Sequence, residues 1–419
     1  MRISSSSRRV GLRVGLAALV LAGVTAGLTA SALGAPPNTK FKKKVTIKPA
    51  PVAQTAVPKA AQSAAPAAAS SAPAATSGMF EVLADSYPSM EGANQFTALG
   101  VKKYMVVYPY FDPDAGTTGL VDADKLIAHV KSQFGNNPQG WGMLDYEGAF
   151  FVNILKGPGN SDYEKTVSSM VAAIKKVKAA FPNVKWTYYG MPYADYWIKN
   201  WWDWQNAPDV ERAGEIDRQA KNFGPIIKEV DWVAPCFYDN SVYSKRTPDQ
   251  RPAEIIREKQ SRIARITVTR EIFKRLNIPA KPIIPVVCLH YSPGGNGVEH
   301  EMIPVDELLM DQITPTLAGG ADGIALWGAH DSYLGLATSP NGNGWAEGAQ
   351  VALRAAWTKS LLNGQVPSNW TAAPVKKQLS DKLQAHVLSA VTKIREAAVT
   401  NGRTVGGPPP QATAGVTKQ

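Results

Sequence analysis

The stretch Gly142-Met143-Leu144-Asp145-Tyr146-Glu147-Gly148 is typical of a buried strand that ends in two carboxylates. Side chains of a strand alternate between its two faces, so Asp145 and Glu147 share one face and Tyr146 lies on the other. Carboxyl groups spaced in this way are roughly 6–7 Å apart at the backbone, close enough for one charge to raise the pKa of the other. One group could then act as an acid while its neighbour stays ionised. Glycoside hydrolases use a carboxyl pair of this kind to cleave a glycosidic bond.

Seven apolar runs alternate with helical patterns downstream of residue 79. The predicted strands are Phe80–Ser86, Tyr104–Tyr110, Gly142–Glu147, Lys185–Gly190, Val230–Phe237, Pro282–Leu289 and Gly323–Trp327. Val- and Ile-rich strands joined by helices indicate a parallel sheet that is covered on both faces. We therefore predict an α/β fold, a distorted TIM-like (β/α) barrel with about seven parallel strands. An open doubly wound sheet is the alternative, but no Gly-rich phosphate loop follows the first strand.

The composition divides the chain into four parts. Residues 1–34 resemble an export signal, with early arginines, an apolar run over 14–28 and a small-residue cleavage site at 32–34, and the route (secretory or twin-arginine) stays open. Residues 35–78 predict a disordered Ala/Pro/Lys-rich linker. Residues 79–363 would form the barrel, and 364–419 a C-terminal helix (374–400) followed by a disordered tail. We expect a secreted, periplasmic or envelope-located monomer.

The net charge of +11 is concentrated in the first 78 residues, which hold ten Lys and Arg and no acid. Residues 79–419 therefore carry only 11 − 10 = +1. A nearly neutral folded part gives no reason to expect nucleic-acid binding. The basic linker could make a weak contact with an anionic cell envelope.

Aromatic and polar residues recur at the predicted strand ends, where β/α barrels place their active sites. They are Tyr108, Tyr110, Asp145, Glu147, Tyr188, Tyr189, Tyr238, Asp239, His290, Tyr291 and Trp327. Aromatic faces cover the apolar side of a pyranose, and phenol hydroxyls bond its polar edge. The set predicts a site for a polysaccharide or oligosaccharide.

Five segments in order resemble the hyaluronidase family of glycoside hydrolases. They are 142–147 (Gly-Met-Leu-Asp-Tyr-Glu), 186–192 (Trp-Thr-Tyr-Tyr-Gly-Met-Pro), 234–238 (Ala-Pro-Cys-Phe-Tyr), 265–291 and 320–328 (Gly-Ala-Asp-Gly-Ile-Ala-Leu-Trp-Gly). The resemblance spans about residues 80–335 and implies a distorted seven-stranded barrel. The near-neutral charge of the folded part departs from the basic groove that hyaluronan calls for.

The resemblance also implies roles for individual residues. Glu147 would donate a proton to the leaving oxygen, and Asp145 would orient the acetamido group of an N-acetylhexosamine, whose carbonyl oxygen replaces an enzyme nucleophile. Tyr238 would hold the acetamido oxygen, Tyr189 would line the same subsite, and Trp327 would form its floor. The outcome would be retaining hydrolysis with no metal or other cofactor.

Three other interpretations stay open. A chitinase-type barrel also ends a strand in Asp-x-Glu, although its acidic run would need Asp at positions that hold Gly140 and Met143. A non-catalytic glycan-binding barrel is the second, but burying two acids gains a binding module little. A metallohydrolase using His290, residues 299–301 and His330 is the third, although no helical His-x-x-x-His exists.

The two cysteines, Cys236 and Cys288, fall in predicted neighbouring strands. An exported protein permits a disulfide between them, and two buried thiols are the equal alternative. Their spacing supports no zinc site.

Overall fold

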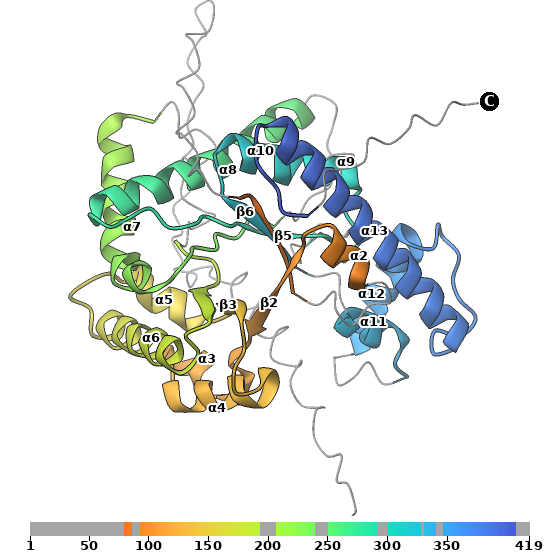
Figure 1. The fold of residues 1–419 in the computed structure, drawn as a ribbon, viewed down its shortest axis with the longest axis horizontal. Coiled ribbons are helices and arrows are strands. Elements are labelled where there is room, and N and C mark those ends of the chain that lie inside the picture. The colour runs from red at the N-terminus through yellow and green to blue at the C-terminus, as the bar shows by residue number, and fades with distance from the viewer. Residues whose placement is uncertain are drawn as a thin grey trace, which may run out of the picture.

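The computed structural model describes residues 79–85, 93–192, 207–238, 250–291, 300–327, 331–340 and 347–407. The predicted export signal and linker lie outside these residues. Within them, helices surround a curled sheet near the centre of the molecule (Figure 1). None of the helices in this part of the chain has the length and apolar character needed to cross a membrane.

The strands are short and the helices carry most of the residues. The strands are β1 (Glu81–Ala84), β2 (Lys102–Val107), β3 (Gly140–Leu144), β4 (Val184–Tyr188), β5 (Val286–Cys288) and β6 (Gly323–Trp327). The helical elements are α2 (Ala93–Ala98), η2 (Pro109–Phe111), α3 (Ala115–Thr118), α4 (Ala123–Phe134), α5 (Ala149–Leu155), α6 (Ser161–Ala180), α7 (Asp209–Glu229), α8 (Gln250–Arg275), α9 (Val305–Leu308), η5 (Leu309–Ile313), α10 (Thr314–Ala318), α11 (Asp331–Thr338), α12 (Glu347–Ser360) and α13 (Ala373–Thr400).

The six strands form one parallel sheet in the order β4-β3-β2-β1-β6-β5. Six of the seven predicted strands are thus confirmed as regular strands, although β5 is much shorter than the predicted Pro282–Leu289. The parallel sheet with helical connections is consistent with a TIM-like fold.

The predicted strand Val230–Phe237 is present as isolated parallel bridges and not as a regular strand. Ala234 bridges to Tyr189 beyond one edge strand, while Val233 and Cys236 bridge to Ile283 and Val286 at the other. This segment therefore links the two edges of the sheet. The ladder is irregular because Pro235, and Pro282 and Pro285 opposite it, have no N–H to donate.

Side chains of the sheet divide into two apolar layers. The inner layer holds Leu83, Tyr104, Trp141, Met143, Tyr189, Trp232, Ala234, Ile284, Val286 and Ala325. The outer layer packs between the sheet and the helices and includes Leu144, Tyr146, Trp186 and Tyr188. Because alternate residues of a strand enter opposite layers, the layer of a strand-end residue follows from its register.

Helix α13 covers the segment predicted as a C-terminal helix, and the structure also describes residues 401–407, which the sequence assigns to the tail. Residues 401–407 pack beside the start of β1, where Phe80 N donates to Thr404 O at 2.7 Å. The buried Arg395 of α13 donates to the carbonyl oxygens of Leu99 and Gly406, which fixes this turn. Residues 408–419 lie outside the described part of the chain.

Candidate active site

The two carboxylates follow directly from β3. Asp145 N donates to Val107 O at 2.9 Å, so the ladder with β2 extends one residue beyond Leu144. Trp141 and Met143 belong to the inner layer and Tyr146 to the outer one, which places Asp145 in the inner register. Gly148 then turns the chain into α5 with φ of 64° and ψ of −115°, a conformation that suits glycine.

Asp145 and Glu147 act on each other as a pair. Burial raises the pKa of Asp145 well above its usual range, and the charge of Glu147 and a hydrogen bond between the two carboxyls raise it further. Burial also raises the pKa of Glu147, while the hydrogen bond from Asp145 lowers it. Glu147 keeps contact with solvent and Asp145 is half-buried, so we assign the larger upward shift to Asp145. Burial is thus the main cause of the raised pKa of Asp145, and the repulsion between the two charges that the sequence predicts is a smaller cause.

The second oxygen of Asp145 has no protein donor among the described residues. Its Oδ1 is buried and accepts no hydrogen bond from them. A buried acceptor without a donor costs about 1–3 kcal/mol. A donor brought to this oxygen would therefore remove that cost.

Aromatic rings at the ends of β2, β4, β6 and the segment 230–237 lie at the same end of the sheet as this pair. Tyr108 and Tyr110, which follow β2, stack with ring centroids 5.3 Å apart. Tyr238 stacks on Trp327 at the end of β6 at 5.3 Å and lies 5.9 Å from Tyr189. The indole Nε1 of Trp327 donates to the Tyr108 hydroxyl at 3.1 Å, which joins the two groups of rings.

The charges of the carboxylates also raise the pKa values of the nearby tyrosines. Burial, followed by the charges of Asp145 and Glu147, raises the pKa of Tyr110. Burial and the charge of Asp145 likewise raise the pKa of Tyr108 and of Tyr238. All three hydroxyls therefore stay protonated and can donate hydrogen bonds at neutral pH. We use the name strand-end site for Tyr108, Tyr110, Asp145, Glu147, Tyr189, Tyr238 and Trp327.

Two of the predicted sugar-binding residues do not enter this group. Tyr188 is buried in the outer layer, where its hydroxyl donates to Met170 O of α6 at 2.9 Å. It faces away from the strand-end site because it is adjacent to Tyr189 on one strand. Tyr291 also lies in the outer layer and donates to Glu307 at 2.7 Å. Asp239 lies outside the described residues.

The next feature is the state of the cysteines and histidines near the site. No disulfide joins Cys236 and Cys288, and both side chains are thiols. His290 is buried beside Trp327, with ring centroids 5.7 Å apart, and beside His300 at 5.6 Å. Within the part of the chain that the structure describes, no three His, Cys, Asp or Glu side chains are grouped as metal ligands. His330 of the metallohydrolase interpretation falls outside that part.

Sequence reasoning missed two residues at this end of the sheet. Asp85 follows β1 in the register of Leu83, an inner-layer residue, and its charge raises the pKa of Tyr104 and Tyr108. Tyr333 of α11 meets Trp327 edge-on at 6.1 Å. Strand alternation could have identified Asp85, whereas no local pattern marks Tyr333.

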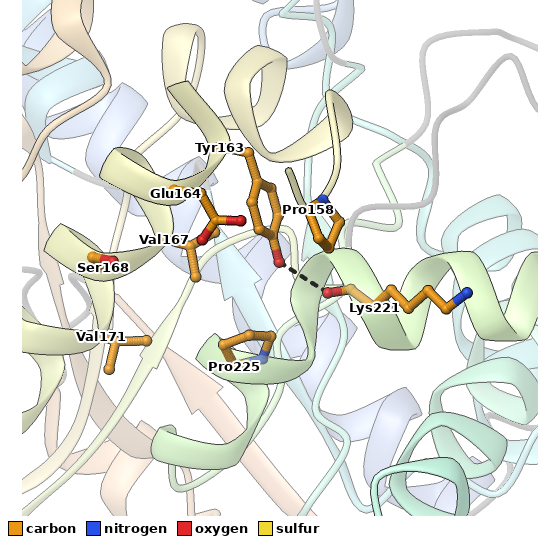
Figure 2. Close-up of a pocket in the computed structure, with 8 residues that line it drawn as sticks. All are labelled: Pro158, Tyr163, Glu164, Val167, Ser168, Val171, Lys221 and Pro225. Atoms are coloured by element: carbon orange, nitrogen blue, oxygen red, sulfur yellow. Dashed lines mark hydrogen bonds between the residues drawn. The ribbon is translucent and has the colours of Figure 1, made fainter. Parts of the chain in front are cut away.

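A hollow of about 380 Å³ lies elsewhere, between α6 and α7 (Figure 2). It is lined by Pro158, Tyr163, Glu164, Val167, Ser168, Val171, Lys221 and Pro225. The Tyr163 hydroxyl donates to Lys221 O at 2.9 Å. We call this hollow the α6–α7 pocket.

Comparisons with known proteins give structural neighbours only. No protein-family model matches the sequence, and a search of curated proteins finds no match. A crystal structure of bee venom hyaluronidase is similar, with 14% identity, a TM-score of 0.44, and coverage of 74% of this chain and 99% of that chain. A structure of bee venom hyaluronidase in complex with a hyaluronic acid tetramer is similar at 14% identity and a TM-score of 0.43, covering 68% of this chain and 98% of that chain.

Proposed function

We propose that this protein is an exported glycoside hydrolase that cleaves glycans containing N-acetylhexosamine. The observation that carries the proposal is the Asp145–Glu147 pair, hydrogen-bonded at the end of β3 and surrounded by half-buried aromatic rings. Paired carboxyls with raised pKa values are the groups that protonate a leaving oxygen near neutral pH. The aromatic rings supply the apolar surface on which a sugar ring stacks.

The hydrogen bond between the two carboxyls indicates where the shared proton lies before substrate binds. It raises the pKa of Asp145 and lowers that of Glu147, and on this basis we assign the shared proton of the free protein to Asp145. An acetamido N–H that donates to Asp145 would favour the ionised form of Asp145. Binding of an N-acetylhexosamine would thereby transfer the proton to Glu147, which makes the acid ready only when the substrate is present.

Glu147 then protonates the glycosidic oxygen as the acetamido carbonyl oxygen attacks the anomeric carbon and the glycosidic bond breaks. The leaving sugar departs with the proton, and a cyclic oxazolinium ion remains. Water attacks the same carbon after giving a proton to the Glu147 carboxylate, which reopens the ring and regenerates the acid. Two displacements at one carbon retain its configuration. Tyr238, Tyr189 and Trp327 would enclose the acetamido group.

The test is release of reducing ends by the purified protein from hyaluronan, chondroitin, chitin oligosaccharides and a peptidoglycan digest. We expect release from at least one of them, and a loss of roughly 10²–10⁴-fold in Glu147→Gln, since general acid catalysis contributes about that factor. Glu229→Gln is the matched control because it makes the same change at the end of α7, beside Lys175. Undiminished release by Glu147→Gln would reject the assignment. Glycan binding without release would favour a non-catalytic glycan-binding barrel.

A further inference from the structure

The turn that follows Glu147 has a backbone conformation that few residues can adopt. Gly148 has φ of 64° and ψ of −115°, a combination that L side chains rarely adopt. At this φ the Cβ of any other L residue would crowd its own backbone, whereas glycine has no Cβ. An L side chain at position 148 would therefore force the backbone toward other dihedral angles.

Packing does not explain why this position holds glycine. Apart from its chain neighbours, a Cβ added to Gly148 would meet no heavy atom of the described residues within 4 Å. Gly142 on β3 differs, because a Cβ there would lie 2.5 Å from the Trp186 ring. In the part of the chain that the structure describes, the backbone conformation is thus the reason for glycine at position 148.

Buried anchors hold the chain on both sides of this turn. Tyr146 and Phe150 are 1% and 0% exposed, and their rings meet edge-on with centroids 5.0 Å apart. The Gly148 carbonyl oxygen accepts a hydrogen bond from Val152 N at 3.1 Å, which ties the turn to α5. Because both ends are anchored, new dihedral angles at Gly148 require compensating changes at Glu147, which would reorient its side chain.

The orientation of Glu147 matters because its carboxyl shares a hydrogen bond with that of Asp145. Asp145 cannot follow a movement of Glu147, since Asp145 N donates to Val107 O at 2.9 Å and its side chain is half-buried. A reorientation of Glu147 would therefore separate the two carboxyls. A displacement of about 1 Å in a reacting group can lower a rate by about 100-fold.

We propose that Gly148 is a positioning residue for Glu147: its backbone conformation holds the acid within hydrogen-bond reach of Asp145 and directs it at the glycosidic oxygen. The inference rests on the proposed function, because it concerns the acid of the same reaction. In this role Gly148 acts only through Glu147 and takes no part in the chemistry itself.

The experiment compares Gly148→Ala with Gly135→Ala in the purified protein. Gly135 is also exposed, has φ of 83° and has no described heavy atom within 4 Å of an added Cβ, but it follows α4 and precedes β3, away from the carboxyl end of that strand. Both variants should unfold at lower urea concentration than the native protein. On a glycan that the protein cleaves, kcat should fall about 10- to 100-fold in Gly148→Ala with KM within about twofold, and Gly135→Ala should keep the native values.

Titration of the two carboxyls gives a readout that does not depend on activity. The hydrogen bond between them raises the pKa of Asp145 and lowers that of Glu147. Once Gly148→Ala separates the carboxyls, the pKa of Asp145 should fall and that of Glu147 should rise, as measured by carbon-13 NMR of the carboxyl groups. Gly135→Ala should leave both pKa values unchanged.

A second variant, Ala149→Gly, loosens the same turn while keeping Gly148. Its control is Ala123→Gly, because Ala123 and Ala149 are the first residues of α4 and α5 and both are half-buried. Added backbone freedom at residue 149 should lower kcat, although less than Gly148→Ala does, and the same freedom at residue 123 should leave kcat unchanged.

The outcomes separate the inference from the proposed function. Native kcat or native carboxyl titrations in Gly148→Ala would overturn the inference, as would equal losses of kcat in Gly148→Ala and Gly135→Ala. If Gly148→Ala does not fold, Ala149→Gly and Ala123→Gly decide by the same criteria. If the native protein cleaves no glycan, the proposed function fails, and the titrations alone still decide whether Gly148 positions Glu147.

Discussion

The α6–α7 pocket and the strand-end site both contain tyrosines and acids, but their polar groups are used in opposite ways. In the pocket, Pro225 lies inside α7 and has no N–H for Lys221 O, the carbonyl one turn earlier. The Tyr163 hydroxyl donates to that carbonyl instead (Figure 2). At the strand ends, Asp145 has a buried oxygen with no donor among the described residues. Polar groups that are satisfied within the chain stabilise the fold, whereas an acceptor without a donor destabilises it until a donor arrives, and we propose that the ligand supplies one here.

After that of Glu147→Gln, the largest expected effect is that of Asp145→Asn on catalysis. An amide cannot ionise, so it cannot accept the acetamido N–H as a carboxylate does or release a proton to Glu147. We expect kcat to fall by about 100-fold or more, as for the loss of other groups that position a reacting charge. Reducing-end release measures the rate, and thermal unfolding shows whether the fold is retained.

Asp231→Asn provides the control for Asp145→Asn. Asp231 is also buried in part, but it bonds Lys178 and Trp186 N, so its replacement should lower stability more than the rate. An Asp145→Asn enzyme with native kcat would show that Asp145 has no part in catalysis.

The second expected effect concerns stability at the pocket. Tyr163→Phe should lower the free energy of unfolding by about 1 kcal/mol, since Lys221 O loses its donor while the pocket still admits water. Urea unfolding measures the change. Activity should stay at the native level because no residue of the strand-end site lines the pocket.

A double-mutant cycle with Pro225→Ala tests the cause of that loss. Alanine at this position restores the helical N–H for Lys221 O. Tyr163→Phe should therefore cost less in the Pro225→Ala background than in the native one. Equal costs in both backgrounds would show that the hydroxyl does not compensate for the proline.

Strand alternation accounts for what the sequence predicts well and for what it misses. It predicts the opposite placement of Asp145 and Tyr146, and the inner and outer layers agree with this. The same rule separates Tyr188 from Tyr189, so only one of these two neighbours can enter the site. The rule also places Asp85 on the face of Leu83, although no motif in the sequence after the first strand marks Asp85 as a site residue.

Long-range contacts explain the remaining differences. The segment 230–237 has the composition of a strand, but the three prolines that break its ladder include two contributed by a segment about 50 residues later. Tyr333 of α11 contacts Trp327 of β6. The sequence around a helical residue does not indicate which residue of another element it contacts. The order of the tail over 401–407 depends on Arg395, whose partners include Leu99, far earlier in the chain.

The third expected effect is a pH dependence of stability that differs between two aspartates. The pKa of Asp145 is raised in the folded state, so the folded protein holds a proton that the unfolded chain releases above about pH 4. Its contribution to stability is complete below that pH and is lost as the pH rises through the folded-state pKa. Asp145→Asn should therefore become more stable relative to the native protein between pH 4 and 8, as measured by thermal unfolding.

The pH dependence of stability that Asp122 contributes should have the opposite sign in the same measurement. It caps α4, and the backbone N–H groups of Lys125 and Asp124 lower its pKa. Its contribution is present above the unfolded-state pKa and is lost as the pH falls through the folded-state pKa. Asp122→Asn should thus approach the native stability toward low pH. The same trend in both variants would contradict the assigned shifts.

The smallest expected effect is that of Tyr108→Phe on substrate binding. The Tyr108 hydroxyl accepts from Trp327 Nε1 at 3.1 Å and so helps to hold the indole against Tyr238. A neutral hydrogen bond of this kind contributes about 0.5–1.5 kcal/mol, which corresponds to a rise in KM of roughly 2- to 12-fold. The change should fall on KM and leave kcat nearly unaltered, because Tyr108 would position a binding surface and not the acid. Tyr163→Phe removes the same hydroxyl from a tyrosine of the α6–α7 pocket, and it should lower stability without changing KM. If Tyr108→Phe instead lowers only stability, Tyr108 belongs with Tyr163 among the residues that support the fold, and the strand-end site is smaller than we propose.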